Sequence, residues 1–253
     1  MRILITEPIN EAGIRLVEEK AEVLLGAGRP REELQEMARD VDGMIVRVIP
    51  IDQDFISGCP KLKVIGKHGV GYDNIQVPVA TERGIAVVFT PGANSISVAE
   101  HALALMLNLA NKVSLADREI RGNQLGAQKR YMGNELQGKT LGLIGLGRIG
   151  RHLARMCQRA FDMKVLAYDP YVSTSLDDVN LCSLEQLLQE ADFISNHVPL
   201  TKETKDIIST PQLATMKKTA FIINTSRGGV VNEDDLYTAL KEGQIAGAGL
   251  DVF

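Results

Sequence analysis

Residues 140–150 have the sequence TLGLIGLGRIG, which contains the pattern that decides the fold. The apolar run before the glycines predicts a buried strand, and the residues after them, as far as Ala160, have the spacing of a helix. Between the two, Gly145, Gly147 and Gly150 form a G-x-G-x-x-G motif. In that context the glycines allow, in order, a tight turn, backbone approach to a pyrophosphate and close packing of the helix on the strand. The stretch therefore predicts dinucleotide binding.

A carboxylate follows the next predicted strand. Asp169 comes directly after the apolar run Val165–Tyr168 and 19 residues after Gly150. A carboxylate at this point can accept hydrogen bonds from both hydroxyls of an adenosine ribose, and it would repel a 2′-phosphate. The expected cofactor is therefore NAD rather than NADP.

Short apolar runs alternate with amphipathic segments from end to end. Runs of Ile, Val and Leu without polar alternation are typical of parallel strands that helices cover on both faces. Strands are expected at 2–6, 21–25, 43–48, 62–66, 85–89, 140–144, 165–168, 193–197, 220–224 and 248–252. Helices are expected at 10–20, 31–38, 52–57, 75–83, 149–160, 183–189, 211–216 and 233–242. The alternation predicts an α/β protein with two Rossmann- or flavodoxin-like, doubly wound parallel sheets.

A cluster of breaker residues at 90–95 divides the chain, and we expect domains at 1–95 and 96–253. Just after it, Ser97 and Glu100 have the spacing of a capping box, which predicts the start of a helix. That helix is apolar on nearly every face, so it is expected to be buried all round, either in a core or at a subunit interface. Two polar stretches follow it, a solvated segment at 115–121 and a glycine-rich connection at 122–138.

Polar residues follow three further predicted strands. In an open α/β sheet, ligands bind outside the carboxyl ends of the strands. An arginine there can hold a carboxylate in a bidentate pair. Each candidate also has a purely structural alternative: His197 could be a structural histidine, Arg227 could form a surface ion pair and Asp251 could cap a turn. In chain order the candidates are His197, Val198 and Pro199, then Thr225, Ser226 and Arg227, then Asp251.

The first half of the chain has its own strand-end feature. Lys67 and His68 lead into Gly69-Val70-Gly71, whose glycines free the backbone amides of Val70 and Gly71 to form an anion-binding nest. A small carboxylate would suit this nest, and Lys67 and Arg47 could add positive charge for an acidic distal group such as a phosphate. The alternative is a glycine-rich turn with a solvated lysine.

The composition excludes several classes of protein. There are 28 Lys and Arg against 32 Asp and Glu, a formal net charge of −4, so no nucleic-acid partner is expected. The longest apolar run, 102–107, is far below the ~20 residues that a membrane span needs, so no membrane partner is expected. Three isolated cysteines indicate reduced thiols in a cytoplasmic protein. No spacing of His, Cys, Asp or Glu suggests a metal site.

One further glycine motif matches the pattern of nucleotide hydrolases, but its position in the chain does not fit that function. GNELQGKT at 133–140 matches the phosphate-loop pattern G-x-x-x-x-G-K-[ST]. Such a loop binds phosphate where it follows a strand and opens a helix. Here it precedes a strand, so we expect a surface turn with an exposed Lys139 rather than a nucleotide hydrolase.

Taken together, these stretches resemble the D-isomer-specific 2-hydroxyacid dehydrogenase family, in particular its D-3-phosphoglycerate dehydrogenase-like members. The resemblance covers nearly the whole chain in the family's order. It is carried by GVGYDN (69–74), TPGANSISVAEHALALML (90–107), ELQGKTLGLIGLGRIG (135–150), HVPLT (197–201), NTSRGGVVNEDDLYTAL (224–240) and GLDVF (249–253).

The resemblance implies a substrate domain at 1–95 and an NAD-binding domain at 96–253, with both ligands in the cleft between them. It implies hydride transfer between nicotinamide and C2 of a D-2-hydroxy acid or 2-oxo acid. Arg227 matches the catalytic arginine and Asp251 the aspartate at the nicotinamide amide. Arg148 and Ile149 match the residues on the pyrophosphate, and Val70 and Gly71 the amides that receive the substrate carboxylate. The helix matching 99–110 would form a homodimer.

The sequence departs from the family in one respect. Family members carry a catalytic Glu and then a catalytic His after the GLDVF stretch, whereas this sequence stops at Phe253. We therefore expect a truncated dehydrogenase whose second domain lacks its usual C-terminal part. Arg227 cannot serve as the acid, because a guanidinium stays protonated. Otherwise His197 or His68 would have to act, or the chain is a non-catalytic NAD(H)-binding or corepressor-like protein.

Overall fold

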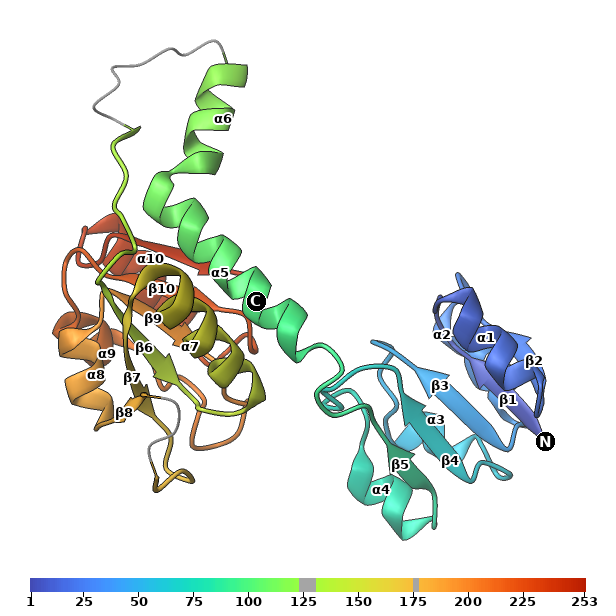
Figure 1. Ribbon diagram of the computed structural model, residues 1–253. Coiled ribbons are helices and arrows are strands. Elements are labelled where there is room, and N and C mark those ends of the chain that lie inside the picture. The colour runs from blue at the N-terminus through green and yellow to red at the C-terminus, as the bar shows by residue number, and fades with distance from the viewer. Residues whose placement is uncertain (123–130, 175–177) are drawn as a thin grey trace. The chain divides into compact units, whose positions relative to one another are not determined.

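The computed structural model describes residues 1–122, 131–174 and 178–253 (Figure 1). The chain forms two compact units, which we call unit 1 (Met1–Asn94) and unit 2 (Ser95–Phe253). Each unit is built on a parallel sheet, and the prediction of an α/β protein with two doubly wound sheets is confirmed.

Unit 1 contains a five-stranded sheet in the order β2-β1-β3-β4-β5, which is the flavodoxin-like order. Its strands are β1 (Arg2–Ile5), β2 (Glu22–Leu25), β3 (Gly43–Val46), β4 (Val64–Lys67) and β5 (Ala86–Val88). Its helices are α1 (Glu11–Glu18), α2 (Arg31–Ala38), α3 (Gln53–Ser57) and α4 (Val77–Glu82).

The helices of unit 1 are short and are fixed by caps and by apolar contacts. Asn10 accepts a hydrogen bond from the Ala12 amide at 2.9 Å at the start of α1, and Asp52 caps α3 in the same way. Caps of this kind each contribute about 0.5–2 kcal/mol. Phe55 of α3 is fully buried in the core that α2, α3 and α4 form with the strands. Packing and capping together therefore hold helices too short to be stable alone.

Unit 2 contains a six-stranded sheet in the order β11-β10-β9-β6-β7-β8, the Rossmann order with its switch point between β6 and β9. Its strands are β6 (Thr140–Ile144), β7 (Lys164–Tyr168), β8 (Asn180–Leu181), β9 (Phe193–Asn196), β10 (Phe221–Asn224) and β11 (Gly247–Leu250). Its helices are α5 (Ser95–Asn111), α6 (Val113–Arg121), α7 (Arg148–Phe161), α8 (Leu184–Glu190), α9 (Thr210–Thr215) and α10 (Glu233–Lys241).

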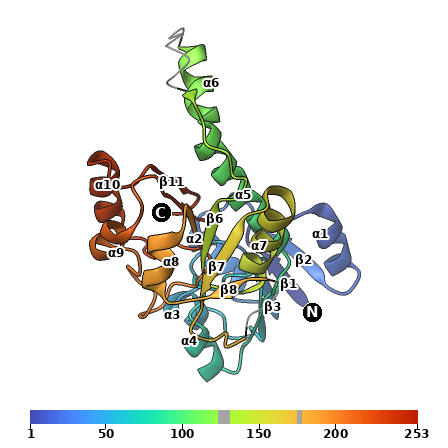
Figure 2. The same cartoon turned by 60° about the vertical axis from the view of Figure 1, so that its left-hand side comes forward.

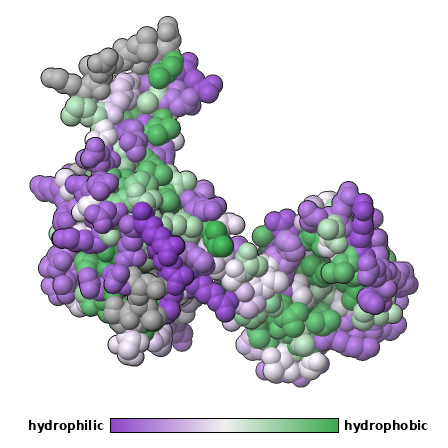
Figure 3. All heavy atoms as spheres, viewed as in Figure 1, coloured by the Kyte–Doolittle hydropathy of each residue, from purple (hydrophilic) through white to green (hydrophobic). Residues whose placement is uncertain are grey.

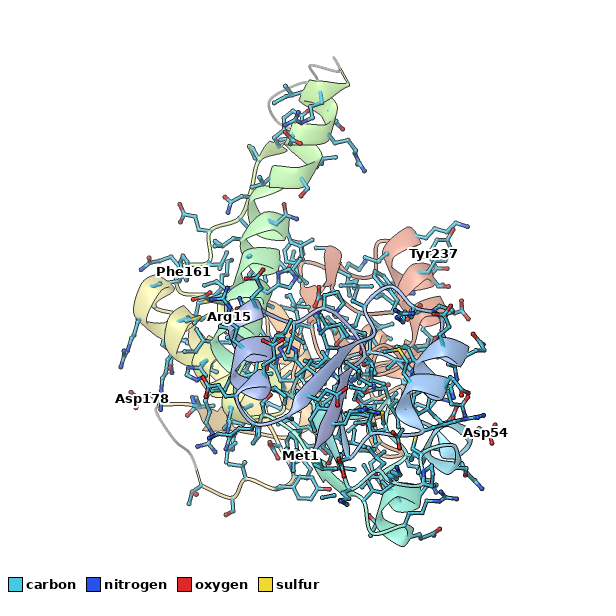
Figure 4. All side chains as sticks on the ribbon, turned by 90° about the vertical axis from the view of Figure 1, so that its right-hand side faces the viewer. Met1, Arg15, Asp54, Phe161, Asp178 and Tyr237 are labelled. Carbon is cyan, nitrogen blue, oxygen red and sulfur yellow. The ribbon has the colours of Figure 1, made fainter. Side chains whose placement is uncertain are left out.

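Helices cover both faces of the sheet of unit 2. α5 and α7 share one apolar core with the sheet, and α8, α9 and α10 share another on the opposite side (Figure 2). Phe161 ends α7 and Tyr237 lies on α10, so these labelled residues mark the two sides (Figure 4). Gly142 lets α8 approach, since a Cβ there would lie 2.6 Å from Cδ2 of Leu187. The strands buried by this packing carry the residues of the site at their ends.

The structure corrects the expectation for the helix after the breaker cluster. α5 begins at Ser95, so Ser97 lies inside the helix and does not cap it. Its buried residues form one stripe, while Ile96 is 54% exposed, so the core of unit 2 covers only one face of this helix, and burial of the other faces at a subunit interface stays a prediction. The stripe packs on α7, β10 and β11, and apolar colouring remains visible on the surface where α5 runs (Figure 3).

Other segments of unit 2 also differ from their predictions. The stretch expected to be solvated, 115–121, is mostly exposed as predicted, but it belongs to a helix without a sequence prediction, α6, which is separated from α5 by Lys112 in the left-handed conformation at φ 54°. The short strand β8 had no sequence prediction, because only two residues pair. Residues 123–130 of the predicted glycine-rich connection lie outside the described residues. Among the described residues, no helix has the length and apolar character to span a lipid bilayer.

Candidate functional site

The glycine motif lies at the switch point, between β6 and α7, and each glycine has its own steric reason. Gly145 has φ +95°, and a Cβ on it would lie 2.8 Å from the carbonyl oxygen of His197. A Cβ on Gly150 would lie 2.5 Å from the carbonyl oxygen of Gly145. A Cβ on Gly147 would meet nothing within 4 Å. Gly145 and Gly150 are therefore required by the fold, whereas Gly147 leaves space for a ligand.

The N-terminus of α7 faces this space. Gly147 is its N-cap and offers no side-chain acceptor to the first amides of a 14-residue helix, and no acidic residue stands in the first turn. Unpaired amides and the helix dipole make such an end an anion site. The side chain of Arg151 fixes the loop by donating to the carbonyl of Leu146 at 2.9 Å.

Asp169 stands where the predicted ribose acceptor should be. One carboxylate oxygen accepts from the amide of Leu146 at 2.9 Å, and the other accepts from the amide of Tyr171 at 2.9 Å. A carboxylate has about four acceptor positions, so both oxygens retain capacity for two hydroxyl groups. The carboxylate is thus oriented by the glycine loop itself.

A cavity of about 350 Å³ adjoins these groups. It combines the glycine loop, the end of β7 and the segment after β9. Its walls are formed by Gly145, Gly147, Tyr168, Asp169, Pro170, Tyr171, His197, Val198, Pro199, Thr201, Glu203, Thr204 and Ile207. The mixture of apolar walls with a few placed polar groups is typical of a cofactor site.

Three buried polar atoms at the strand ends have no hydrogen-bond partner among the described residues: Oδ1 of Asn196, Nδ1 of His197 and Oγ1 of Thr225. Nε2 of His197 is 3.0 Å from Oγ of Ser195. Burial lowers the pKa of His197 to about 4, so the imidazole is neutral at ordinary pH. Buried polar atoms without partners are unusual. Together with the cavity and the free space at Gly147, they fit a bound dinucleotide.

The turn after β10 presents Arg227. Asn224 folds this turn: its Oδ1 accepts from the amide and the hydroxyl of Ser226, and its Nδ2 donates to the carbonyl of Arg227 at 2.8 Å. The guanidinium of Arg227 is half-buried and donates to the carbonyl of Ser226 at 2.6 Å. Asn224 therefore sets the direction in which this arginine leaves the sheet.

Asp251 has a partner that the sequence did not indicate. Nε2 of His101 on α5 lies 3.2 Å from Oδ1 of Asp251, and both side chains are about half exposed. No local pattern links positions 101 and 251, because only the packing of α5 against β11 brings them together.

The predicted anion nest lies in unit 1. Val70 and Gly71 are partly exposed in the turn after β4, Gly69 has φ +149°, and Thr90 donates to the carbonyl of Gly69 at 3.0 Å. His68 is exposed. Lys67 is 8% exposed, and its ammonium donates to protein oxygens inside unit 1. In unit 2, Gln137 and Gly138 form a turn before β6 and Lys139 is exposed, as expected for a surface turn.

A comparison with models of protein families finds a match, which lies within unit 2. Residues 103–253 match the family model described as D-isomer specific 2-hydroxyacid dehydrogenase, NAD binding domain. The chain belongs to the D-isomer specific 2-hydroxyacid dehydrogenase family. The residues that match this NAD-binding domain model all lie in unit 2.

Individual relatives cover the whole chain. It is 45% identical to D-3-phosphoglycerate dehydrogenase of Methanocaldococcus jannaschii over 100% of this chain and 49% of that enzyme. It is 42% identical to glyoxylate reductase of Korarchaeum cryptofilum over 100% of this chain and 79% of that enzyme. The crystal structure of TT0316 protein from Thermus thermophilus has a TM-score of 0.92 and 37% identity, covering 100% of this chain and 82% of that one. The chain thus spans about half the length of the phosphoglycerate dehydrogenase.

We predict that Gly147→Ala weakens cofactor binding but leaves the stability of the fold nearly unchanged. An alanine suits the φ of −75° at this position and meets no neighbour, so the free energy of unfolding should change by less than about 1 kcal/mol. The added methyl group should weaken NADH binding at least about tenfold. In Gly145→Ala, strain and the close carbonyl should instead cost about 1–3 kcal/mol of stability. Urea unfolding and NADH fluorescence titration measure both; equal NADH affinity in wild type and Gly147→Ala would contradict the site.

A second prediction concerns His197. Because its pKa is lowered to about 4 in the folded state, the unfolded chain binds the proton more readily between about pH 6.5 and 4. The free energy of unfolding should therefore decrease as the pH is lowered through this window. Between pH 7 and pH 5 the decrease should be about 1–2 kcal/mol larger in wild type than in His197→Gln. Urea unfolding at both pH values tests this. An imidazole resonance of His197 that titrates near pH 6.5 would disprove it.

Proposed function

We propose that the protein is an NAD-dependent oxidoreductase that transfers a hydride between nicotinamide and C2 of a D-2-hydroxy acid or its 2-oxo acid. The observation that carries the proposal is the common edge of the sheet of unit 2. Residues Ile144, Asn196, Asn224 and Leu250 lie level across four adjacent strands. The glycine loop, His197, Arg227 and Asp251 therefore leave the sheet at one edge.

The residues of unit 2 fit the successive parts of NAD. Asp169 would hold the adenosine ribose, and the α7 amides near Gly147 would hold the pyrophosphate, with Arg148 and Ile149 beside it. The remaining contacts we assign are Val198 and Pro199 at the adenosine side, His197 and Thr225 with their unsatisfied atoms, Ser226, and Asp251 oriented by His101. When bound, NAD supplies the hydride acceptor or donor, which no side chain of the chain can replace.

Arg227 has the chemistry for the substrate. A guanidinium binds a carboxylate or a polarised carbonyl oxygen with paired hydrogen bonds, and it stays charged at all relevant pH values. It cannot exchange a proton with the substrate oxygen, and the neutral, half-buried His197 is equally unsuited to act as the acid. The proton therefore comes from another group.

We assign the substrate carboxylate to the amides of Val70 and Gly71 in unit 1, with Lys67 and His68 as the neighbouring candidates. The names of the relatives indicate small 2-oxo acids or a phosphorylated one as substrates: a glyoxylate reductase and a D-3-phosphoglycerate dehydrogenase match over the whole of this chain. We therefore place unit 1 as the substrate domain and unit 2 as the NAD domain.

We also propose a cytoplasmic homodimer. Cys59, Cys157 and Cys182 are free thiols, which is usual in a reducing compartment. The α5 segment 99–110 has partly buried leucines between its buried residues, and a second copy could cover them. Sedimentation of the wild-type chain would test the dimer.

The choice of cofactor depends on Asp169. Replacing it in Asp169→Ala removes the ribose acceptor and the charge that repels a 2′-phosphate, so NADH should bind at least about tenfold more weakly while the preference over NADPH falls. Fluorescence titration with both cofactors measures this. Asp162→Asn, at the opposite end of α7, is the control and should bind NADH like wild type. Unchanged NADH affinity in Asp169→Ala, with no gain for NADPH, would disprove the assignment.

The reaction itself is tested by NADH oxidation with glyoxylate, hydroxypyruvate and phosphohydroxypyruvate. We expect at least one acid to be reduced, and Arg227→Lys should lower kcat/KM at least about 100-fold because lysine cannot form the paired contact. NADH affinity should change little in this variant. NADH binding without turnover of any of these acids, even after a family-type C-terminal segment is added, would favour a non-catalytic NAD(H)-binding protein.

A further inference from the structure

A glutamate at the end of β1 binds the backbone of the loop that follows β3. Its carboxylate accepts hydrogen bonds from three successive amides and a neighbouring hydroxyl. This glutamate is Glu7. Its carboxylate accepts from the amides of Arg47 at 2.6 Å, Val48 at 2.7 Å and Ile49 at 3.0 Å, and from the Thr6 hydroxyl at 2.8 Å. Successive amides that converge on one anion form a nest. Unit 1 fills this nest with its own side chain.

The carbonyl groups of the same loop are bound by two other side chains. Nζ of Lys67 donates to the carbonyl of Arg47 and, at 2.6 Å, to Oδ1 of Asn74. The amide group of Asn74 donates to the carbonyl of Ile49 at 2.7 Å. The loop Arg47–Ile49 is therefore clamped between a carboxylate and an ammonium group, and the ammonium of Lys67 is directed at protein oxygens.

The clamped loop carries an exposed cation. Arg47 is exposed, and its Nη1 donates to the carbonyl of Pro8, the residue after Glu7, at 2.9 Å. Val46 and Lys67 are register partners in β3 and β4, so Arg47 and His68 leave the sheet side by side. The turn with the amides of Val70 and Gly71 follows at once. The guanidinium thus stands at the same sheet edge as the predicted anion nest.

We propose that Glu7 is a positioning residue for acid binding by unit 1: it holds the loop Arg47–Ile49 and through it the guanidinium of Arg47. This inference rests on the proposed function, which places a substrate carboxylate on the amides of Val70 and Gly71. It assigns Lys67 to the clamp and Arg47 to the contact with the acid.

The ionisation state of Glu7 agrees with this role. Burial alone would raise the pKa of its carboxyl group, but hydrogen bonds from the amides of Arg47, Val48 and Ile49 and from the Thr6 hydroxyl outweigh burial and lower that pKa. The carboxylate form is therefore the one that the loop stabilises. While it occupies these three amides, an incoming acid can use only the other donors of this edge.

Glu7→Gln tests the inference in the 253-residue chain. The variant keeps the size of the side chain, removes its charge and turns a donor group toward the loop amides. The probe is oxamate, a non-reducible analogue of a 2-oxo acid, titrated by calorimetry with NADH present. We expect oxamate to bind about tenfold more weakly, with NADH affinity unchanged within about twofold. The amide proton resonances of residues 47–49 should move upfield as their bonds to the carboxylate are lost.

Two further variants separate positioning from general stability. Asp42→Asn is the matched control, since Asp42 also accepts a backbone amide, that of Arg2 at 2.9 Å, but at the opposite end of the same sheet. It should not weaken oxamate binding. Arg47→Ala should weaken binding, and adding Glu7→Gln to it should bring no further loss, because Glu7 acts through Arg47.

The outcomes distinguish this inference from the proposed function. If wild type binds oxamate but Glu7→Gln binds it equally well, or if Asp42→Asn loses as much, the positioning role is wrong and the proposed function stands. Additive losses in the double variant would likewise overturn the action through Arg47. If wild type binds NADH but no oxamate, the acid site proposed for unit 1 is wrong.

Discussion

Unit 2 depends on one close approach, between the backbone of Gly145 and the carbonyl group of His197. No Cβ fits between them. The amide of Gly145 donates to the carbonyl of Tyr168 at 2.9 Å, and the amide of His197 donates to that of Ile144 at 2.8 Å. The glycine loop is thus held between the ends of β7 and β9. The chain therefore leaves the sheet at the switch point. A ligand that needs the N-terminus of α7 must bind there.

The neighbouring strands end at the same height in the sheet, so the side chains at their ends lie beside the glycine loop. Asn196, Asn224 and Thr225 are polar yet buried, which is costly unless each polar atom is satisfied. Asn224 meets this demand by folding the turn that carries Arg227. Within the described part of the chain, Oδ1 of Asn196, Oγ1 of Thr225 and Nδ1 of His197 do not meet it. The sheet thus divides its buried polar groups between those that build the site and those available to a ligand.

The sequence predicted the fold well because its signals are local. The apolar runs, the glycine spacing and the position of Asp169 after the glycines each involve no more than 25 consecutive residues, and backbone sterics fix their meaning. The start of α5 was misjudged because a capping box can also occur by chance inside a helix. The pairing of His101 with Asp251 and the four bonds of Glu7 could not be predicted. They join residues that are far apart in the sequence, and only packing shows which of them meet.

Charge is the property that the sequence describes least reliably. Lys67, next to a glycine-rich turn, has the local pattern of a ligand for an anion, and Glu7, beside a proline, has the pattern of a surface residue. In the folded unit both charges serve the same loop, the lysine on its carbonyl groups and the glutamate on its amides. A backbone loop has donors and acceptors that must be satisfied, and a nearby charge of either sign can meet that demand. Whether a charged residue serves the protein or a ligand therefore depends on which backbone groups the fold leaves unsatisfied beside it.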